Sequence, residues 1–153
     1  MQHSTTRVAA LGAAMALALA AGAARAETAE EARSLLDGAL TEIRTHGLDK
    51  AVKGFNAGGK WKKDRLYLVA MQLDGMVLAN SANTKLPGHN MLESKDANGR
   101  AFFKDATQLV KTSGSGQVDL RWGNPVTRRL SDATMFVQRV PGQDVYLGSL
   151  VFK

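Results

Sequence analysis

Residues 66–80 constrain the fold of this chain more than any other segment. Two runs rich in aromatic and branched side chains flank Asp74-Gly75. An Asp-Gly pair between such runs is a strong hairpin signal, because glycine accepts the positive φ of a tight turn without a Cβ clash. Alternate residues of a strand point to opposite faces. We therefore expect the face with Tyr67 and Met71 to form the floor of a pocket and the other face to meet a helix.

Hydrophobic residues upstream of the hairpin recur at three- and four-residue spacing. Between Ala29 and Ile43 they form one apolar stripe, which is typical of an amphipathic helix. Thr28 and Glu31 fit a capping box at its start. A second, shorter helix is expected over residues 48–57, because glycines follow and precede this apolar pattern.

Downstream of the hairpin, a polar segment over residues 81–98 leads into a helix expected over residues 101–111. Three more strands are expected over residues 117–122, 133–140 and 145–152, separated by glycine- and proline-containing turns. Strands in hairpin order, with the helices grouped in the first half and in one connection, indicate an α+β domain. We predict a five-stranded antiparallel sheet with a long N-terminal helix and flanking short helices.

The first residues have the pattern of an export signal. Arg7 precedes an apolar run over residues 8–24, and the run ends in Ala-Arg-Ala, the small-x-small pattern of a signal peptidase site. We expect residues 1–26 to be a signal peptide cleaved near Ala26. Residues 27–153 would then form a single domain that is periplasmic or secreted. An uncleaved N-terminal membrane anchor is the alternative.

Composition excludes several classes of function. The chain has no cysteine, which rules out disulfides, thiolate catalysis and Cys-ligated metals. Its formal charge is +6, but the only dense basic cluster is residues 60–65, which contain Trp61. A nucleic-acid-binding protein usually has a longer basic stripe. We interpret the cluster as the solvated lead-in to the first strand and expect no nucleic-acid partner.

The polar residues lack the pattern of a catalytic or metal site. His46 and His89 belong to different predicted elements, and neither has an acidic residue at metal-ligand spacing. Asp96 and Asn98 resemble the start of a calcium loop, but the glutamate that such a loop requires is missing, so a turn is expected there. We predict no catalytic residue, no metal and no cofactor.

A binding site is better supported than a catalytic one. Apolar and aromatic side chains can supply the walls of a pocket, and a few polar side chains can orient a ligand in it. The predicted walls are Tyr67, Met71, Phe103, Trp122, Met135 and Phe136, and the predicted polar anchors are Asn80, His89 and Arg121. Such a pocket favours an apolar or aromatic small molecule with one polar end. The alternative is that the aromatic residues are simply core.

The order of these elements resembles the single Cache domain, type 2, an extracytoplasmic relative of the PAS fold. The resemblance covers nearly all of residues 27–153. It is carried by Leu66-Tyr67-Leu68-Val69, Asp74-Gly75-Met76-Val77-Leu78-Ala79, Pro87-Gly88-His89-Asn90, Asp96-Ala97-Asn98-Gly99-Arg100, Trp122-Gly123-Asn124-Pro125, Phe136-Val137-Gln138-Arg139-Val140-Pro141-Gly142 and Gly148.

The resemblance implies a sensory domain that holds a small molecule between its sheet and a loop-helix segment. Family members often carry Lys and Tyr on the fourth strand to hold a carboxylate, and Ala133 and Phe136 occupy those positions here. It also implies a membrane receptor or kinase as partner, and a homodimer through the N-terminal helix, whose stripe packing on the sheet would explain equally well. Two other functions remain open: a structural or interaction module without a ligand, and a small periplasmic enzyme.

Overall fold

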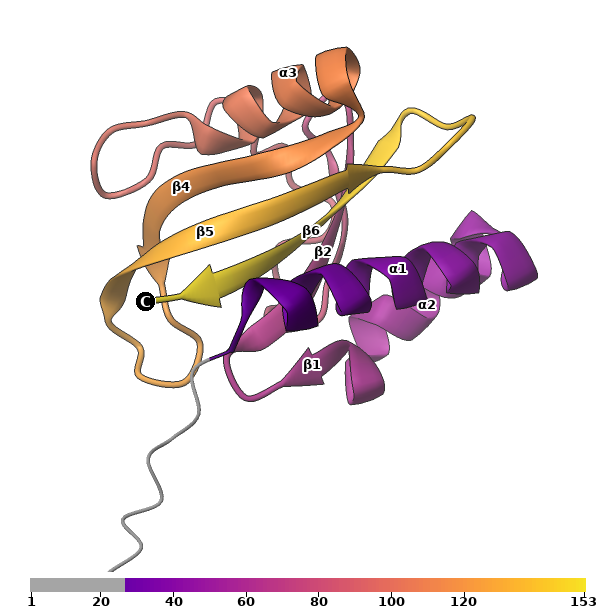
Figure 1. The fold of residues 1–153 in the computed structure, drawn as a ribbon, viewed down its shortest axis with the longest axis horizontal. Helices are drawn as coiled ribbons and strands as arrows, with labels where there is room; N and C mark the ends of the chain where they lie inside the picture. The colour runs from indigo at the N-terminus through magenta and orange to yellow at the C-terminus, as the bar shows by residue number, and fades with distance from the viewer. Residues whose placement is uncertain (1–26) are drawn as a thin grey trace, which may run out of the picture.

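The computed structural model describes residues 27–153, so the predicted signal peptide lies outside the described residues. Three helices and six strands form one α+β unit, as predicted, with one strand more than expected (Figure 1). The helical elements are α1 (Ala29–His46), α2 (Leu48–Ala57), the single 3-10 turn η1 (Gly59–Trp61) and α3 (Phe102–Ser113). The strands are β1 (Lys62–Lys63), β2 (Leu66–Gln72), β3 (Val77–Asn80), β4 (Ser115–Gly123), β5 (Leu130–Arg139) and β6 (Val145–Phe152).

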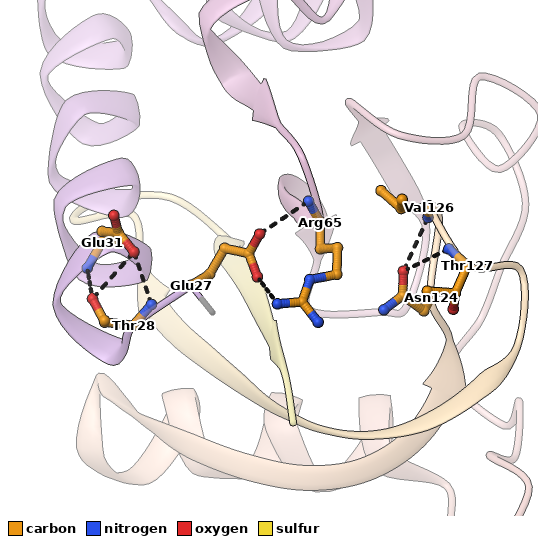
Figure 2. Close-up of polar contacts among 7 residues, drawn as sticks. All are labelled: Glu27, Thr28, Glu31, Arg65, Asn124, Val126 and Thr127. Carbon is orange, nitrogen blue, oxygen red and sulfur yellow. Dashed lines mark hydrogen bonds and ion pairs between the residues drawn. The ribbon is translucent and has the colours of Figure 1, made fainter. Parts of the chain in front are cut away.

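Helix α1 begins at the capping box that the sequence predicts. The Thr28 hydroxyl accepts a hydrogen bond from the Glu31 backbone N–H at 3.2 Å, and Glu31 Oε2 accepts one from the Thr28 N–H at 2.8 Å (Figure 2). These two bonds satisfy N–H groups that have no partner inside the helix. The helix ends at Gly47, and α2 starts directly after it.

The sheet is antiparallel throughout and has the strand order β1-β2-β6-β5-β4, with β3 sharing one edge of β2 with β1. The hairpin expected at Asp74-Gly75 is confirmed, since β2 and β3 pair with Val69 opposite Asn80. Asp74 Oδ1 accepts a hydrogen bond from the Met76 N–H at 3.0 Å, which closes the turn.

Strand β1 is the element that the sequence did not predict. Asp64 has a φ of 53°, so the chain reverses at this residue and Lys62 and Lys63 pair with Tyr67 and Leu66. The basic cluster is therefore a short edge strand. Trp61 is buried at its start.

The two faces of the sheet are covered by different helices. Figure 1 shows α1 and α2 together on one side, while α3 lies on the other side close to β4. Leu66, Leu68 and Ala70 belong to the buried cluster under α1, which we call the α1-side layer. Tyr67 and Met71 belong to the cluster under α3, which we call the α3-side layer. The predicted division of the hairpin into two faces is thus confirmed.

Gly38 offers a direct test of how α1 packs. It lies within α1, and a Cβ at this position would lie 3.7 Å from Trp61 Cζ3, which is ordinary van der Waals contact. Glycine inside a helix costs about 0.5–1 kcal/mol relative to alanine. Gly38→Ala should therefore raise the free energy of unfolding, measured by urea denaturation, by about this amount. A lower free energy of unfolding would contradict the observed packing of α1 beside Trp61.

Within residues 27–153, no helix has both the length and the apolar character that crossing a membrane requires.

Candidate ligand-binding site

The α3-side layer brings together most of the side chains that the sequence proposes as pocket walls. Tyr67, Met71, Phe103 and Met135 are all buried within it. Trp122 packs against its margin and is partly exposed. These residues come from β2, α3, β5 and β4, so the layer is assembled from elements that are distant in the sequence.

The aromatic side chains of this layer are arranged around α3. The ring centroids of Phe102 and Trp122 are 5.0 Å apart at an interplanar angle of 63°, and those of Phe103 and Trp122 are 6.4 Å apart at 78°. Edge-on geometry of this kind is favoured between aromatic rings. The start of α3 is therefore held against β4 by three aromatic side chains.

Tyr67 places a hydroxyl group in this apolar layer. Its side chain is 4% exposed, and its ring stacks on Phe152 with centroids 6.4 Å apart. Burial raises the pKa of the phenol well above its usual range. Among residues 27–153 no group hydrogen bonds to this hydroxyl. Tyr67 thus carries a hydroxyl without a protein acceptor in a mostly apolar layer, although the buried side-chain atoms of residues 27–153 that lack a hydrogen-bond partner are Glu27 Oε2 and Ser149 Oγ.

Tyr146 is the second tyrosine of the layer, and it differs from Tyr67 because its hydroxyl is paired. Thr107 Oγ1 donates to the Tyr146 hydroxyl at 3.4 Å, and that hydroxyl donates to Met71 Sδ at 3.4 Å. Burial raises the pKa of Tyr146 to about 12, although the bond from Thr107 opposes the shift. The sequence-based site did not include Tyr146 or Thr107. The alternation along the last strand, which sets Tyr146 on the same face as Leu150, is the signal that could have found Tyr146.

The buried side chains of the α3-side layer are uncharged. They are aromatic or aliphatic residues together with Thr107, and no Lys, Arg or His is among them. An ionised ligand in this layer would lose its hydration without gaining a charged partner, which is costly. The layer is therefore suited to a neutral molecule.

The predicted polar anchors lie outside this layer or are already paired. Asn80 is buried, but its Oδ1 accepts hydrogen bonds from the backbone N–H groups of residues 82 and 83 at 2.9 and 2.8 Å, so it shapes the start of the long loop. His89 has an exposed side chain. Arg121 is partly exposed, and its Nη1 forms an ion pair with Asp132 at 2.9 Å.

Phe136 lies apart from the other predicted wall residues. Phe136 belongs to the α1-side layer, where the Arg33 guanidinium lies 4.8 Å from its ring centroid. Met135 precedes it directly on β5 and faces α3. Consecutive strand residues point to opposite faces of a sheet. These two side chains therefore cannot line one pocket.

Asp96 fastens the loop that borders the α3-side layer. Its carboxylate accepts hydrogen bonds from the backbone N–H groups of Asn98 at 3.0 Å, Arg100 at 2.9 Å and Arg121 at 2.9 Å. Burial acts to raise its pKa, but these three bonds and the charge of Arg100 outweigh burial and lower the pKa. The turn predicted here is confirmed by the hydrogen bond from the Gly99 N–H to the Asp96 carbonyl.

A groove lies on the other side of the sheet. It has a volume of about 460 Å³ and lies between α1 and the segment of η1 and β1. Its lining combines apolar and charged side chains: Glu27, Glu31, Ser34, Leu35, Gly38, Lys60, Trp61, Lys63, Asp64 and Leu66. Trp61 lines this groove, whereas Trp122 packs against the α3-side layer.

No cluster of three or more His, Cys, Asp or Glu residues suited to a metal ion occurs within the part of the chain that the structure describes.

Comparison with known proteins places this architecture in a family. A family model described as Cache domain matches residues 28–151. Among curated proteins no match was found. A methyl-accepting chemotaxis protein from Vibrio parahaemolyticus is similar in structure, with a TM-score of 0.69 and 17% identity over 80% of this chain and 86% of the other.

Two further structures are similar over the same share of this chain. The periplasmic sensor domain of a chemotaxis protein has a TM-score of 0.64 and 22% identity over 80% of this chain and 88% of its own. A Cache chemosensory domain, whose description reports carboxylic acid recognition, has a TM-score of 0.64 and 25% identity over 80% and 86%. Cache domains are extracytoplasmic sensor and ligand-binding modules rather than catalytic domains. The match over residues 28–151 shows that this chain belongs to the Cache domain family.

Proposed function

We propose that this chain is an exported, non-catalytic sensor domain that binds a neutral small molecule between the sheet and α3. The observation that carries the proposal is the Tyr67 hydroxyl, which lies in an apolar layer and has no protein acceptor. A hydroxyl that makes no hydrogen bond to the protein can donate one to an acceptor on a ligand. Tyr67 lies on the face of β2 that packs against α3.

The uncharged lining favours one class of ligand. The Cache chemosensory domain that recognises carboxylic acids is 25% identical to this chain. In this chain, Ala133 and Phe136 occupy the strand positions where relatives often carry a cation and a phenol. Ala133 lies in the α3-side layer and Phe136 faces α1. We therefore propose an apolar or aromatic molecule with one neutral acceptor, such as a carbonyl or ether oxygen, aimed at Tyr67.

We propose that a partner protein transmits the signal of the bound sensor domain. Residues 27–153 form the sensor fold itself, and a membrane receptor or histidine kinase that recognises its bound state would complete the signal. Helix α1 also carries exposed side chains such as Glu30, Thr41 and Thr45, and pairing of two copies along this exposed side is the form of dimer that we propose.

A ligand screen by thermal unfolding tests the proposal. A molecule that binds only the folded state at a concentration 100 times its Kd stabilises that state by about 2.7 kcal/mol and raises Tm by several degrees. We expect such shifts from neutral apolar and aromatic compounds, and none from short carboxylates. No shift with any neutral compound would favour a structural module whose interior is filled by its own side chains.

The two tyrosines of the layer provide a matched pair of variants. Tyr67→Phe removes an unpaired hydroxyl, so the free energy of unfolding without ligand should stay within about 0.5 kcal/mol of the wild type or rise. The affinity for a compound found in the screen should fall about tenfold, because one hydrogen bond to the ligand is lost.

Tyr146→Phe should show the opposite behaviour. It breaks the bonds to Thr107 and Met71, so unfolding should become easier by about 1–2 kcal/mol. The affinity of the folded protein for the compound should change little. Equal losses of affinity in the two variants would speak against Tyr67 as the ligand donor.

A further inference from the structure

The connection between β4 and β5 exposes apolar side chains that the core does not use. Val126 is 59% exposed and Leu130 is 58% exposed, and they are the exposed large hydrophobic residues of the described part of the chain. Arg128 and Arg129 lie between them in the sequence and are also exposed. Apolar residues flanking two adjacent arginines on one loop form a surface with both hydrophobic and cationic character.

This loop is held in a defined conformation. Asn124 is 3% exposed, and its Oδ1 accepts hydrogen bonds from the backbone N–H groups of Val126 at 2.9 Å and Thr127 at 3.2 Å (Figure 2). The Asn124 carbonyl accepts a further bond from the Arg128 N–H at 2.9 Å. Arg128 adopts a φ of 57°, in the left-handed region that non-glycine residues rarely enter. The hydrogen-bonded conformation of the loop therefore keeps Val126 exposed.

A second cationic segment lies beside the loop. Figure 1 shows β1 and the β4–β5 connection at the same end of the molecule, away from α3, and Figure 2 places Arg65 next to Asn124 and Thr127. Lys62 and Lys63 are exposed on β1. Within residues 27–153 they form no ion pair, and the same holds for the two loop arginines. Asp64 is the one carboxylate of the β1–β2 turn.

The described chain also begins at this end. Arg65 Nη2 forms an ion pair with Glu27 Oε2 at 2.9 Å, which ties the first described residue to the β1–β2 turn. The apolar run of residues 8–24 precedes Glu27 in the sequence by only a few residues. In the full, uncleaved chain, which corresponds to the membrane-anchored alternative, a bilayer bound by that run would lie within short reach of the loop and the turn.

We infer that the β4–β5 loop and the β1–β2 turn dock on the surface of an anionic lipid bilayer. Val126 and Leu130 would enter the boundary between headgroups and acyl chains, while the four unpaired cations would contact acidic headgroups. Docking would fix the orientation of the sensor domain on the membrane. Ligand binding between the sheet and α3 does not itself require this orientation.

Site-specific labelling can test this docking on the full chain, because the chain contains no cysteine. Thr127→Cys carries an environment-sensitive nitrobenzoxadiazole probe beside Val126, and Gln108→Cys on the exposed side of α3 is the matched control. Both proteins are reconstituted in phosphatidylcholine vesicles with and without phosphatidylglycerol. We expect a blue-shifted, brighter emission at position 127 only when phosphatidylglycerol is present, and no change at position 108.

Three further variants in the Thr127→Cys background separate the apolar contribution to docking from the cationic one. Replacing Val126 and Leu130 by serine should abolish the blue shift. Each of Arg128→Gln and Arg129→Gln should lower the ratio of docked to undocked protein about fivefold, since a cation near an acidic surface contributes about that factor. The proposal would be overturned if the emission of the probe at position 127 were the same with and without phosphatidylglycerol. It would also be overturned if the emission at position 108 changed by the same amount as that at position 127.

Discussion

Gly75→Ala should lower the free energy of unfolding by about 2–4 kcal/mol. Gly75 has a φ of 95°, where a side chain costs about 1–2 kcal/mol. A Cβ at this position would also collide with Leu92 Cβ and would lie 2.7 Å from Asn90 Oδ1. Relieving such a collision moves the backbone of the long loop and costs about another 1–3 kcal/mol. The hairpin turn is thus also the point where the long loop rests on the sheet.

Gly142→Ala is the matched control for this prediction. Gly142 lies in the turn between β5 and β6 with a φ of 75°, and a Cβ there would meet nothing within 4 Å. This variant should lose only the cost of the backbone conformation, about 1–2 kcal/mol. Urea denaturation of both variants measures the difference. Equal losses would mean that the contact between Gly75 and the loop contributes nothing to stability.

Asp96→Ala should be the second strongly destabilising variant, with a loss of about 2–3 kcal/mol. Asp96 is 7% exposed, and its carboxylate accepts hydrogen bonds from three backbone N–H groups, including that of Arg121 on β4. Its removal leaves the Arg121 N–H without an acceptor and frees the loop from the edge of the sheet. Hydrogen exchange of the loop amides, together with urea denaturation, measures the effect.

The contribution of Asp96 should also depend on pH. Its pKa is lower in the folded state than in the unfolded chain, where aspartate titrates at about 3.9. The ionised carboxylate therefore stabilises the fold at pH above the unfolded pKa, and this stabilisation is lost as pH falls through the folded pKa. The difference in free energy of unfolding between wild type and Asp96→Asn should shrink below about pH 4. A difference that stays constant from about pH 6 to about pH 2 would contradict this account.

The parts of the fold that depend on neighbouring residues could be predicted from the sequence. Asp74-Gly75 and the capping box of Thr28 and Glu31 act within a few residues, and both occur as expected. Strand β1 could not be predicted in this way. Its pairing with β2 requires a positive φ at Asp64, a conformation that a non-glycine residue rarely adopts.

The candidate site could be predicted only in part, because its decisive features are non-local. Alternation placed Tyr67 and Met71 on one face correctly, and the same rule, applied to Met135 and Phe136, would have separated these two residues. The bond between Thr107 and Tyr146 joins residues 39 apart in the sequence. That the Tyr67 hydroxyl has no protein acceptor becomes visible only when all of its neighbours are placed.

The two tryptophans of the chain provide the most direct test of where the ligand binds. Trp122 packs against the α3-side layer and Trp61 lines the groove beside α1. Each indole N–H gives one proton–nitrogen NMR signal, and Trp122→Phe assigns the pair. A compound that raises Tm should shift the Trp122 signal and leave the Trp61 signal in place. A shift of the Trp61 signal alone would show that the ligand binds under α1 and would contradict the central claim.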